Sequence, residues 1–432
     1  MTFAGHLAAG AQLPGEIRYD SAMPNHVVSK RFTRGVLTVI CGAALMQAAP
    51  SGAFPSPERS PSAADAAPLR RVQLFDSPAV AEYKRRLAEY EEARAAYEAE
   101  ASAYWNLVAE KRRARNAKRR EKVALAAEDY VLDQPPAYEG PKRPINPNPE
   151  PEPEKPGRSP KYIPVLADFL AAARQHFDFV PQRPANEVEF KRAYVRAATA
   201  EGLTRDQIIR VFAFETGGNG AYTMQSGFAS GRPDAHAIST AIGYNQLLTT
   251  NTVELIAEQG EHFVRVLTER AHALAGAARK AMDHKIAALK RMLALCRSVP
   301  DDWSQHEKIA NTEAGWGVHA MVFDVDVGPL LQTHKLLTSV IFARERGVTR
   351  TLTAAELEMM NLTGDGTGLD MVTMPAALRE QVPTSNFFQR GGYERNPVAI
   401  RHNTVARLFA VMNARMDSAQ GAAGAKEMAS VF

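Results

Sequence analysis

One carboxylate in the sequence, Glu215, has surroundings that suit acid–base chemistry. It closes an apolar run, residues 204–214, and is followed by Gly217 and Gly218, which are expected to end the helix. Apolar burial and the negative end of the helix dipole both disfavour a charged carboxylate, so we expect a raised pKa for Glu215. A general acid working near neutral pH needs such a pKa. The alternative is a glutamate that turns outward into solvent.

The helix that carries Glu215 has a recognisable beginning. Thr204 and Gln207 form a capping box, in which the hydroxyl accepts from a free amide and the glutamine side chain reaches back. Apolar side chains then predict a deeply buried helix: Ile208, Ile209, Val211, Phe212 and Phe214.

A second motif, residues 239–248 (STAIGYNQLL), follows this helix. It resembles the G-L-M-Q-L segment of lytic transglycosylases and goose-type lysozymes, and Glu215-Thr216-Gly217 stands where they have their catalytic E-S-G. Residues 326–337 resemble the family's next helix, residues 359–364 (MMNLTG) its A-Y-N-A-G, and residues 382–388 its closing segment. These motifs occur in family order.

The resemblance implies a lysozyme-like all-α domain that cleaves peptidoglycan between N-acetylmuramic acid and N-acetylglucosamine. Glu215 would protonate the departing oxygen and then take the proton of the muramyl C6 hydroxyl, giving a 1,6-anhydro end. One carboxyl serves both steps, so a second carboxylate is unnecessary. The implied substrate-binding residues are Thr216, Gly243, Tyr244, Gln246 and Asn361. Gln246 would bind a sugar amide and Tyr244 would offer an apolar face, although packing alone is an equal alternative for both.

The sequence also departs from the family pattern. Residues 219–238 and 253–325 are insertions, and the second is expected to form a helical excursion. Met360 replaces the tyrosine whose hydroxyl contacts the acid in the family, so we expect Tyr244 or Tyr222 to make that contact or the acid to be held less well. Two other functions stay open: a non-catalytic glycan-binding or envelope scaffolding protein on the same fold, and a hydrolytic muramidase.

Metal and cofactor motifs are missing from the sequence. It has no nucleotide-binding fingerprint and no HExxH, so we expect no cofactor and no metal. The two cysteines, Cys41 and Cys296, cannot form a zinc or disulfide framework. No pair of histidines has convincing zinc geometry among positions 236, 262, 272, 284, 306, 319, 334 and 402.

The beginning of the chain (1–53) is interpreted as a secretory signal region. Basic residues precede an apolar stretch from Gly35 to Ala49, and small residues precede a cut at Phe54. We therefore expect a periplasmic or secreted protein, or a membrane-anchored one if the signal is not cleaved. The late basic region leaves Met1 or Met23 as the initiator.

The next three segments differ sharply in composition. Residues 54–75 are rich in Pro and Ala and are expected to be flexible. Residues 76–133 are expected to form a charged helical module that resembles a coiled coil. Its tyrosines recur every seven residues and suggest self-association or an envelope partner. Its basic second half suggests either a solvated face or an anionic surface, and the net charge of +4 gives no indication of nucleic acid. Residues 134–160 are expected to form an extended Pro-rich linker.

The rest of the chain is helical in pattern. Strand signals are sparse, so the class is all-α, with a catalytic domain at 161–416 and a flexible tail at 417–432. Asn186 is expected to cap a helix that runs to about Ala200. Residues 261–297 are expected to form one long helix.

Overall fold

The computed structural model describes residues 77–149, 162–228 and 235–432. The predicted signal region (1–53) and flexible segment (54–75) lie outside the described residues.

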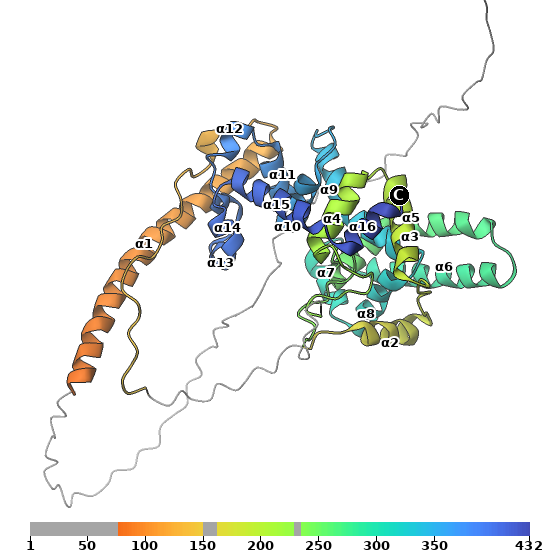
Figure 1. Cartoon of the computed structure of the whole chain (residues 1–432), viewed down its shortest axis with the longest axis horizontal. Coiled ribbons are helices and arrows are strands. Elements are labelled where there is room, and N and C mark those ends of the chain that lie inside the picture. The colour runs from red at the N-terminus through yellow and green to blue at the C-terminus, as the bar shows by residue number, and fades with distance from the viewer. Residues whose placement is uncertain (1–76, 150–161, 229–234) are drawn as a thin grey trace, which may run out of the picture. The chain divides into compact units, whose positions relative to one another are not determined.

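Within these ranges the chain is built from helices, with isolated β-bridges such as Ile242–Leu247 as its extended pairings (Figure 1). The predicted all-α class is confirmed. None of the described helices is both long enough and apolar enough to cross a bilayer. In chain order the α-helices and 3-10 helices (η) are α1 (Pro78–Arg120), η1 (Ala127–Asp129), α2 (Leu166–Phe177), α3 (Glu187–Ala200), α4 (Arg205–Thr216), α5 (Thr249–His272), α6 (Gly276–Cys296), α7 (Trp303–Ala310), α8 (Glu313–His319), η2 (Ala320–Phe323), α9 (Val327–Glu345), α10 (Ala354–Thr363), α11 (Asp365–Thr373), α12 (Ala376–Arg379), η3 (Thr384–Phe387), α13 (Arg390–Glu394), α14 (Pro397–Arg401), α15 (Val405–Ala419) and α16 (Ala423–Ser430).

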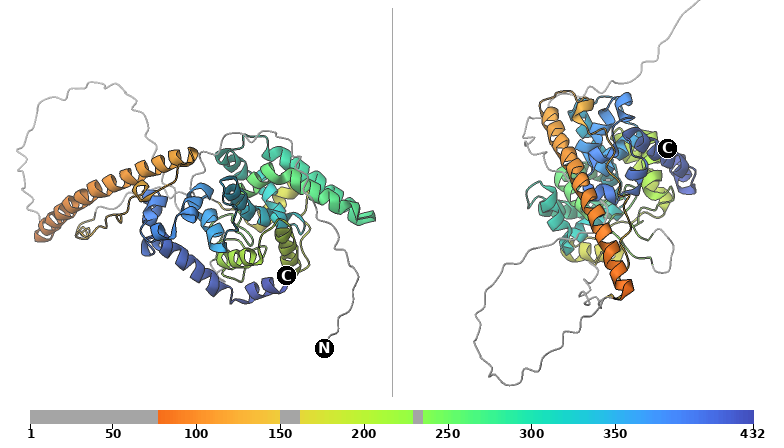
Figure 2. Two further views of the ribbon diagram at one scale, coloured as in Figure 1. Left: turned by 90° about the horizontal axis from the view of Figure 1, so that it is seen from above. Right: turned by 90° about the vertical axis from the view of Figure 1, so that its left-hand side faces the viewer.

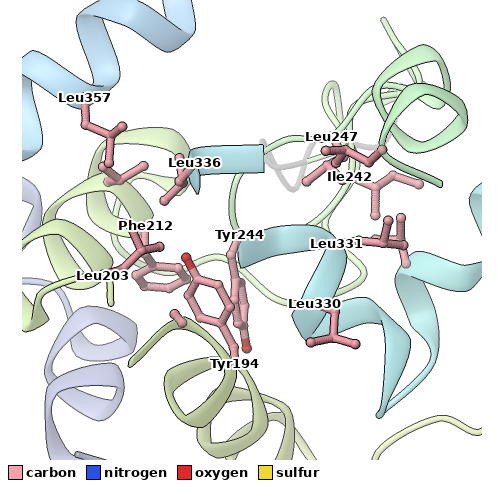
Figure 3. Close-up of a cluster of buried hydrophobic side chains, with 14 of the residues drawn as sticks. Tyr194, Leu203, Phe212, Ile242, Tyr244, Leu247, Leu330, Leu331, Leu336 and Leu357 are labelled. Carbon is pink, nitrogen blue, oxygen red and sulfur yellow. The ribbon is translucent and has the colours of Figure 1, made fainter. Parts of the chain in front are cut away.

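Helix α4, which carries Glu215, packs against α3, α10, α15 and α16. Its capping box is formed as predicted: the Gln207 amide donates to the Thr204 hydroxyl at 3.2 Å, and the Gln207 side chain accepts from the Thr204 amide at 2.8 Å. Gly217 ends the helix with φ +62°, a conformation that glycine adopts without strain. Phe212 is fully buried and meets Tyr244 edge to face at 5.0 Å (Figure 3).

Two more local predictions agree with the structure. The Asn186 side chain accepts from the Glu189 amide and caps α3, which ends at Ala200. Helix α9 begins after Asp324, whose buried carboxylate accepts from the Val327 amide and pairs with Lys285 of α6 at 2.9 Å. This ion pair ties α6 to the start of α9.

The predicted single helix at 261–297 is wrong. Instead α5 ends at His272 and α6 starts at Gly276, so the two helices pack against each other as an antiparallel hairpin (Figure 2). Gly276 has φ +58°, which allows the chain to reverse here. The hairpin realises the helical excursion expected from the insertion at 253–325.

The predicted flexible tail at 417–432 is also a helix in the structure. Ala425 and Met428 are three positions apart on α16 and both are buried. The buried ammonium of Lys191 pairs with Glu427 at 2.5 Å. This apolar face and the ion pair attach α16 to α3 and α4.

The charged helix α1 is not held apart from the rest of the chain. Tyr138, in the described part of the expected linker, packs edge-on against Tyr90 at 6.2 Å and Tyr97 at 5.5 Å. The linker therefore folds back along α1 and covers part of the tyrosine seam that suggested an external partner. At the other end, the Tyr104 hydroxyl lies 2.6 Å from that of Ser385.

The basic half of α1 is a solvated face only in part. Arg113 is exposed, whereas Arg115 is buried and its guanidinium lies 3.3 Å from the Asp370 carboxylate. Asp370 belongs to α11, so α1 and α11 are joined by a buried ion pair.

Candidate active site

The end of α4 and the middle of α10 bring three polar side chains together. Glu215 is half-buried next to the last residue of α4, and Glu358 and Asn361 lie one turn apart on α10. The Asn361 side-chain amide donates to Glu215 Oε1 at 3.2 Å. The sequence predicted Glu215 and Asn361 as site residues, and the fold places them in contact.

Glu358 is the residue that the sequence analysis missed. Its side chain is fully buried, and its carboxyl lies in hydrogen-bond contact with that of Glu215. The Asn361 amide lies close enough to lower the pKa of Glu358 slightly, but neither oxygen of Glu358 has an N–H or hydroxyl donor in good hydrogen-bond geometry within the described ranges. Burial and the neighbouring Glu215 charge raise the pKa of Glu358 well above its ordinary value. Glu358 therefore holds its proton to a higher pH than an ordinary glutamic acid, which suits it to donate a hydrogen bond to Glu215.

Burial also raises the pKa of Glu215, in the direction predicted from the sequence. The hydrogen bond from Glu358 and the positive charge of Lys335 act in the opposite direction, because both stabilise the carboxylate. The half-buried Glu215 can reach solvent, whereas Glu358 cannot. Of the two carboxyls, only Glu215 is placed to meet a substrate.

More acids surround Lys335 of α9. Its charge acts on Asp365 and Glu254 as well as on the Glu215–Glu358 pair. Burial and the nearby Glu258 raise the pKa of Glu254 to about 8, and burial raises that of Glu258 to about 7. Near neutral pH, Glu254 and Glu258 are therefore each present in both protonated and charged forms.

The raised pKa of Glu254 predicts a pH-dependent loss of stability. Folded protein keeps the Glu254 proton that unfolded protein releases, so the free energy of unfolding falls as pH rises from about 4.5 to about 8. Glu254→Gln cannot titrate and should lose less stability over this range. Melting temperatures at both ends of the range measure the difference.

The exposed Glu269, also on α5, supplies the control. Glu269→Gln should follow the wild-type decline. Equal slopes for Glu254→Gln and wild type would contradict the assignment.

Two predicted site residues serve the local backbone. The Thr216 hydroxyl is buried and donates to the Phe212 carbonyl at 2.6 Å. Gly243 has φ +83°, and a side chain there would collide with the amide of Gln332 at 2.1 Å. The fold therefore requires glycine at position 243.

The two predicted sugar contacts are placed differently from the expectation. Tyr244 is fully buried, and its hydroxyl donates to Glu187 of α3, so its ring offers no face to a sugar. Figure 3 shows this ring among the buried apolar side chains. The half-buried Gln246 turns its amide onto the Gly243 carbonyl at 2.8 Å. Packing, the alternative for both residues, fits these positions better.

Neither tyrosine expected to replace the family hydroxyl reaches Glu215. The Tyr244 hydroxyl is bonded to Glu187, and that of Tyr222 accepts from Arg183 at 3.0 Å. Met360 is fully buried. The groups that hold Glu215 are Glu358 and Asn361.

Comparisons with known proteins add no identification. No family model, no curated protein and no solved structure matches this chain.

A sequence signal for Glu358 does exist. In residues 354–360 (AAELEMM) every residue except Glu356 and Glu358 is apolar, which indicates a helix enclosed on all sides, and all seven residues are buried in the structure. Glu356 is explained by its capping box with Thr353 and by Arg350. Glu358 lacks such a partner, and an acid without a partner in an enclosed helix indicates a functional site.

Proposed function

We propose that this protein is a lytic transglycosylase, an enzyme that cleaves peptidoglycan strands from a lysozyme-like helical domain. The observation that carries the proposal is the half-buried Glu215 at the end of a buried helix, with a neutral Glu358 and an Asn361 amide as its hydrogen-bond donors. The order of the motifs between 215 and 388 supports the choice of substrate.

The proposed reaction needs one carboxyl, Glu215, that first gives up a proton and then regains one. Protonated Glu215 gives its proton to the glycosidic oxygen between N-acetylmuramic acid and N-acetylglucosamine, and the C1–O bond breaks. The Glu215 carboxylate then takes the proton of the muramyl C6 hydroxyl as that oxygen bonds to C1. The carboxyl pair changes from neutral to one negative charge and returns to neutral, so no water is consumed.

The closeness of the two carboxyls argues against ordinary hydrolysis. Glycosidases that use two carboxylates hold them on either side of the bond, about 5–5.5 Å apart for retention and about 6.5–9.5 Å for inversion. Glu215 and Glu358 are in hydrogen-bond contact, and Glu358 is fully buried. Neither a sugar nor an attacking water fits between them.

Glu358 supplies the hydroxyl donor that Met360 cannot. A protonated carboxyl donates one O–H, as the family tyrosine does, and its contact stabilises the conjugate base of Glu215. Glu358 therefore positions the Glu215 carboxyl although the family tyrosine is replaced by Met360.

The substrate also fixes where the protein would act. Peptidoglycan lies outside the cytoplasm, so this function requires export, in agreement with the expected signal region. We therefore propose a periplasmic or secreted enzyme whose partner is the glycan strand.

Product analysis tests the proposed function. Purified protein incubated with cell-wall sacculi should release muropeptides with 1,6-anhydro ends, measured by mass spectrometry as products that lack one water. Reducing ends would instead identify a hydrolytic muramidase. Binding of sacculi with no product would favour the non-catalytic alternative, a glycan-binding or scaffolding protein.

Substitutions at Glu358 test its role as a donor to Glu215. Glu358→Leu removes the hydrogen bond to a charged group, worth about 1.5–3 kcal/mol, and should lower kcat about 10- to 100-fold. The pKa of Glu215 should rise, so the pH at which activity is lost should move upward. Kinetic profiles over pH measure both effects.

Glu358→Gln is the matched rescue variant, because its amide is neutral and still donates. It should keep most of the activity. An inactive Glu358→Gln protein with wild-type folding would contradict the donor role and indicate that Glu358 transfers a proton or attacks directly.

A further inference from the structure

Three ligand-type side chains from separate helices meet on the described part of the fold, outside the Glu215 site. They are Glu201 at the end of α3, His262 of α5 and His334 of α9. Their ligand atoms all lie within 4.8 Å of one another. The sequence spacing gave no sign of this cluster, because 61 and 72 residues separate its members along the chain.

An ordinary ion pair explains only part of the arrangement. The Glu201 carboxylate contacts His262 Nε2 at 3.0 Å, which accounts for these two side chains. His334 Nε2 lies 4.0 Å from the same oxygen, beyond hydrogen-bond distance. His334 is 4 % exposed, and its Nε2 has no hydrogen-bond partner in the described chain. A buried, unpartnered ring nitrogen aimed at a carboxylate is costly unless something binds it.

We propose that Glu201, His262 and His334 bind a zinc ion. Two imidazole nitrogens and one carboxylate oxygen are a ligand set that zinc uses in proteins, with ligand distances of about 2.0–2.2 Å. Tetrahedral ligands at that distance stand about 3.4 Å apart. The Glu201–His262 and Glu201–His334 distances of 3.0 Å and 4.0 Å bracket this value, and all three ligand atoms lie within 4.8 Å of one another, so side-chain rotations could bring them to tetrahedral spacing.

The surroundings suit a cation with one open position. About a quarter of the Glu201 and His262 side chains is exposed, 28 % and 27 %, so solvent can supply the fourth ligand. His334 is fixed from the other side by Phe263, whose ring meets it edge-on at 5.0 Å.

The bound ion would brace the packing behind the proposed active site. α9 contacts both α3 and α5, and the ligands come from each of these three helices. α9 also carries Lys335, the residue next to His334. The site does not depend on the glycan chemistry, so it is tested apart from that proposal.

Zinc binding by the tag-free full chain tests the inference. Titration calorimetry with zinc chloride should show one ion per chain, and cobalt(II) should give the visible absorption bands of a four-coordinate site. Glu201→Gln and His262→Ala should each weaken binding more than about tenfold and remove the bands. His272→Ala, an exposed histidine of the same α5 helix, should bind like wild type.

His334→Ala is the most direct variant, but it creates a cavity in the core and could destabilise the protein. Circular dichroism checks its folding, and the half-buried Glu201 and His262 carry the test if it unfolds. Absence of zinc and cobalt binding by wild type would overturn the inference. Unchanged binding in folded Glu201→Gln and His262→Ala would overturn it too, because the ion would then sit elsewhere.

Discussion

Glu215→Gln is expected to remove the release of 1,6-anhydro products from sacculi, with a fall in kcat of about 10²- to 10⁴-fold. Glutamine keeps the size and hydrogen-bonding shape of the side chain but cannot transfer a proton, and proton transfer accounts for a factor of this size. The loss should appear in kcat rather than in binding to sacculi, because the substitution leaves the surface unchanged. Chromatography of released muropeptides against time measures it.

Folding of the Glu215→Gln protein separates lost chemistry from lost structure. Burial raises the pKa of Glu215, so replacing it with a neutral amide removes a charge that the fold disfavours at high pH. Its melting temperature at neutral pH should equal or exceed that of wild type. The exposed Glu269→Gln should keep full activity. A folded Glu215→Gln protein with wild-type turnover would show that another group is the acid.

The pH dependence of wild-type turnover should follow from the same assignment. Glu215 acts as an acid only while protonated, so activity is present below its raised pKa and falls as pH rises through it. The Glu358 contact and Lys335 limit how far that pKa rises. The direction of the profile thus reports on Glu215, and its position reports on the two neighbours.

The features that could be predicted from the sequence are local ones. The Thr204–Gln207 box, the Gly217 stop and the Asn186 cap each depend on residues within a few positions, and all three are formed. Glu215 was found because apolar residues surround it along the same helix. Asn361 was found only through the family resemblance.

Contacts between residues that are distant in the sequence could not be predicted. Glu358 meets Glu215 across 143 positions, and its chemistry depends on that contact. The predicted roles of Tyr244 and Gln246 differ from their positions for a related reason: the loop at 239–248 folds on itself and onto α3. A motif gives the order of residues, whereas burial decides which of them face a substrate.

The basic residues of α1 show that the role of a charged side chain also depends on contacts that the local sequence does not reveal. A row of arginines indicates a solvated face or an anionic partner, yet Arg115 is buried at 1 % exposure. Its two terminal nitrogens donate to the carbonyls of Asp129 and Asn386, each at 2.9 Å. Its guanidinium lies over the Tyr130 ring, 4.5 Å from the centroid. With the Asp370 carboxylate, these groups give the buried Arg115 four partners within its own chain.

Asp370 is the only carboxylate that compensates this buried charge in the contacts described for Arg115. It pairs with Arg115 at 3.3 Å and Arg119 at 2.8 Å, and it accepts from the Tyr130 hydroxyl at 3.1 Å. Removing one partner of a buried ion pair strands the other, at a cost of about 3–5 kcal/mol. Asp370→Leu should therefore lower the free energy of unfolding by about that amount, measured by urea denaturation.

The double variant Arg115→Met with Asp370→Leu gives the matched comparison. It removes both charges, so it should be more stable than Asp370→Leu alone. Arg113→Ala, exposed in the same basic run, should change stability by less than about 0.5 kcal/mol. Equal destabilisation by Asp370→Leu and Arg113→Ala would show that α1 does not dock through this network. If the network holds, deleting residues 77–133 removes a packed part of the structure, and activity on small soluble glycans should fall with stability.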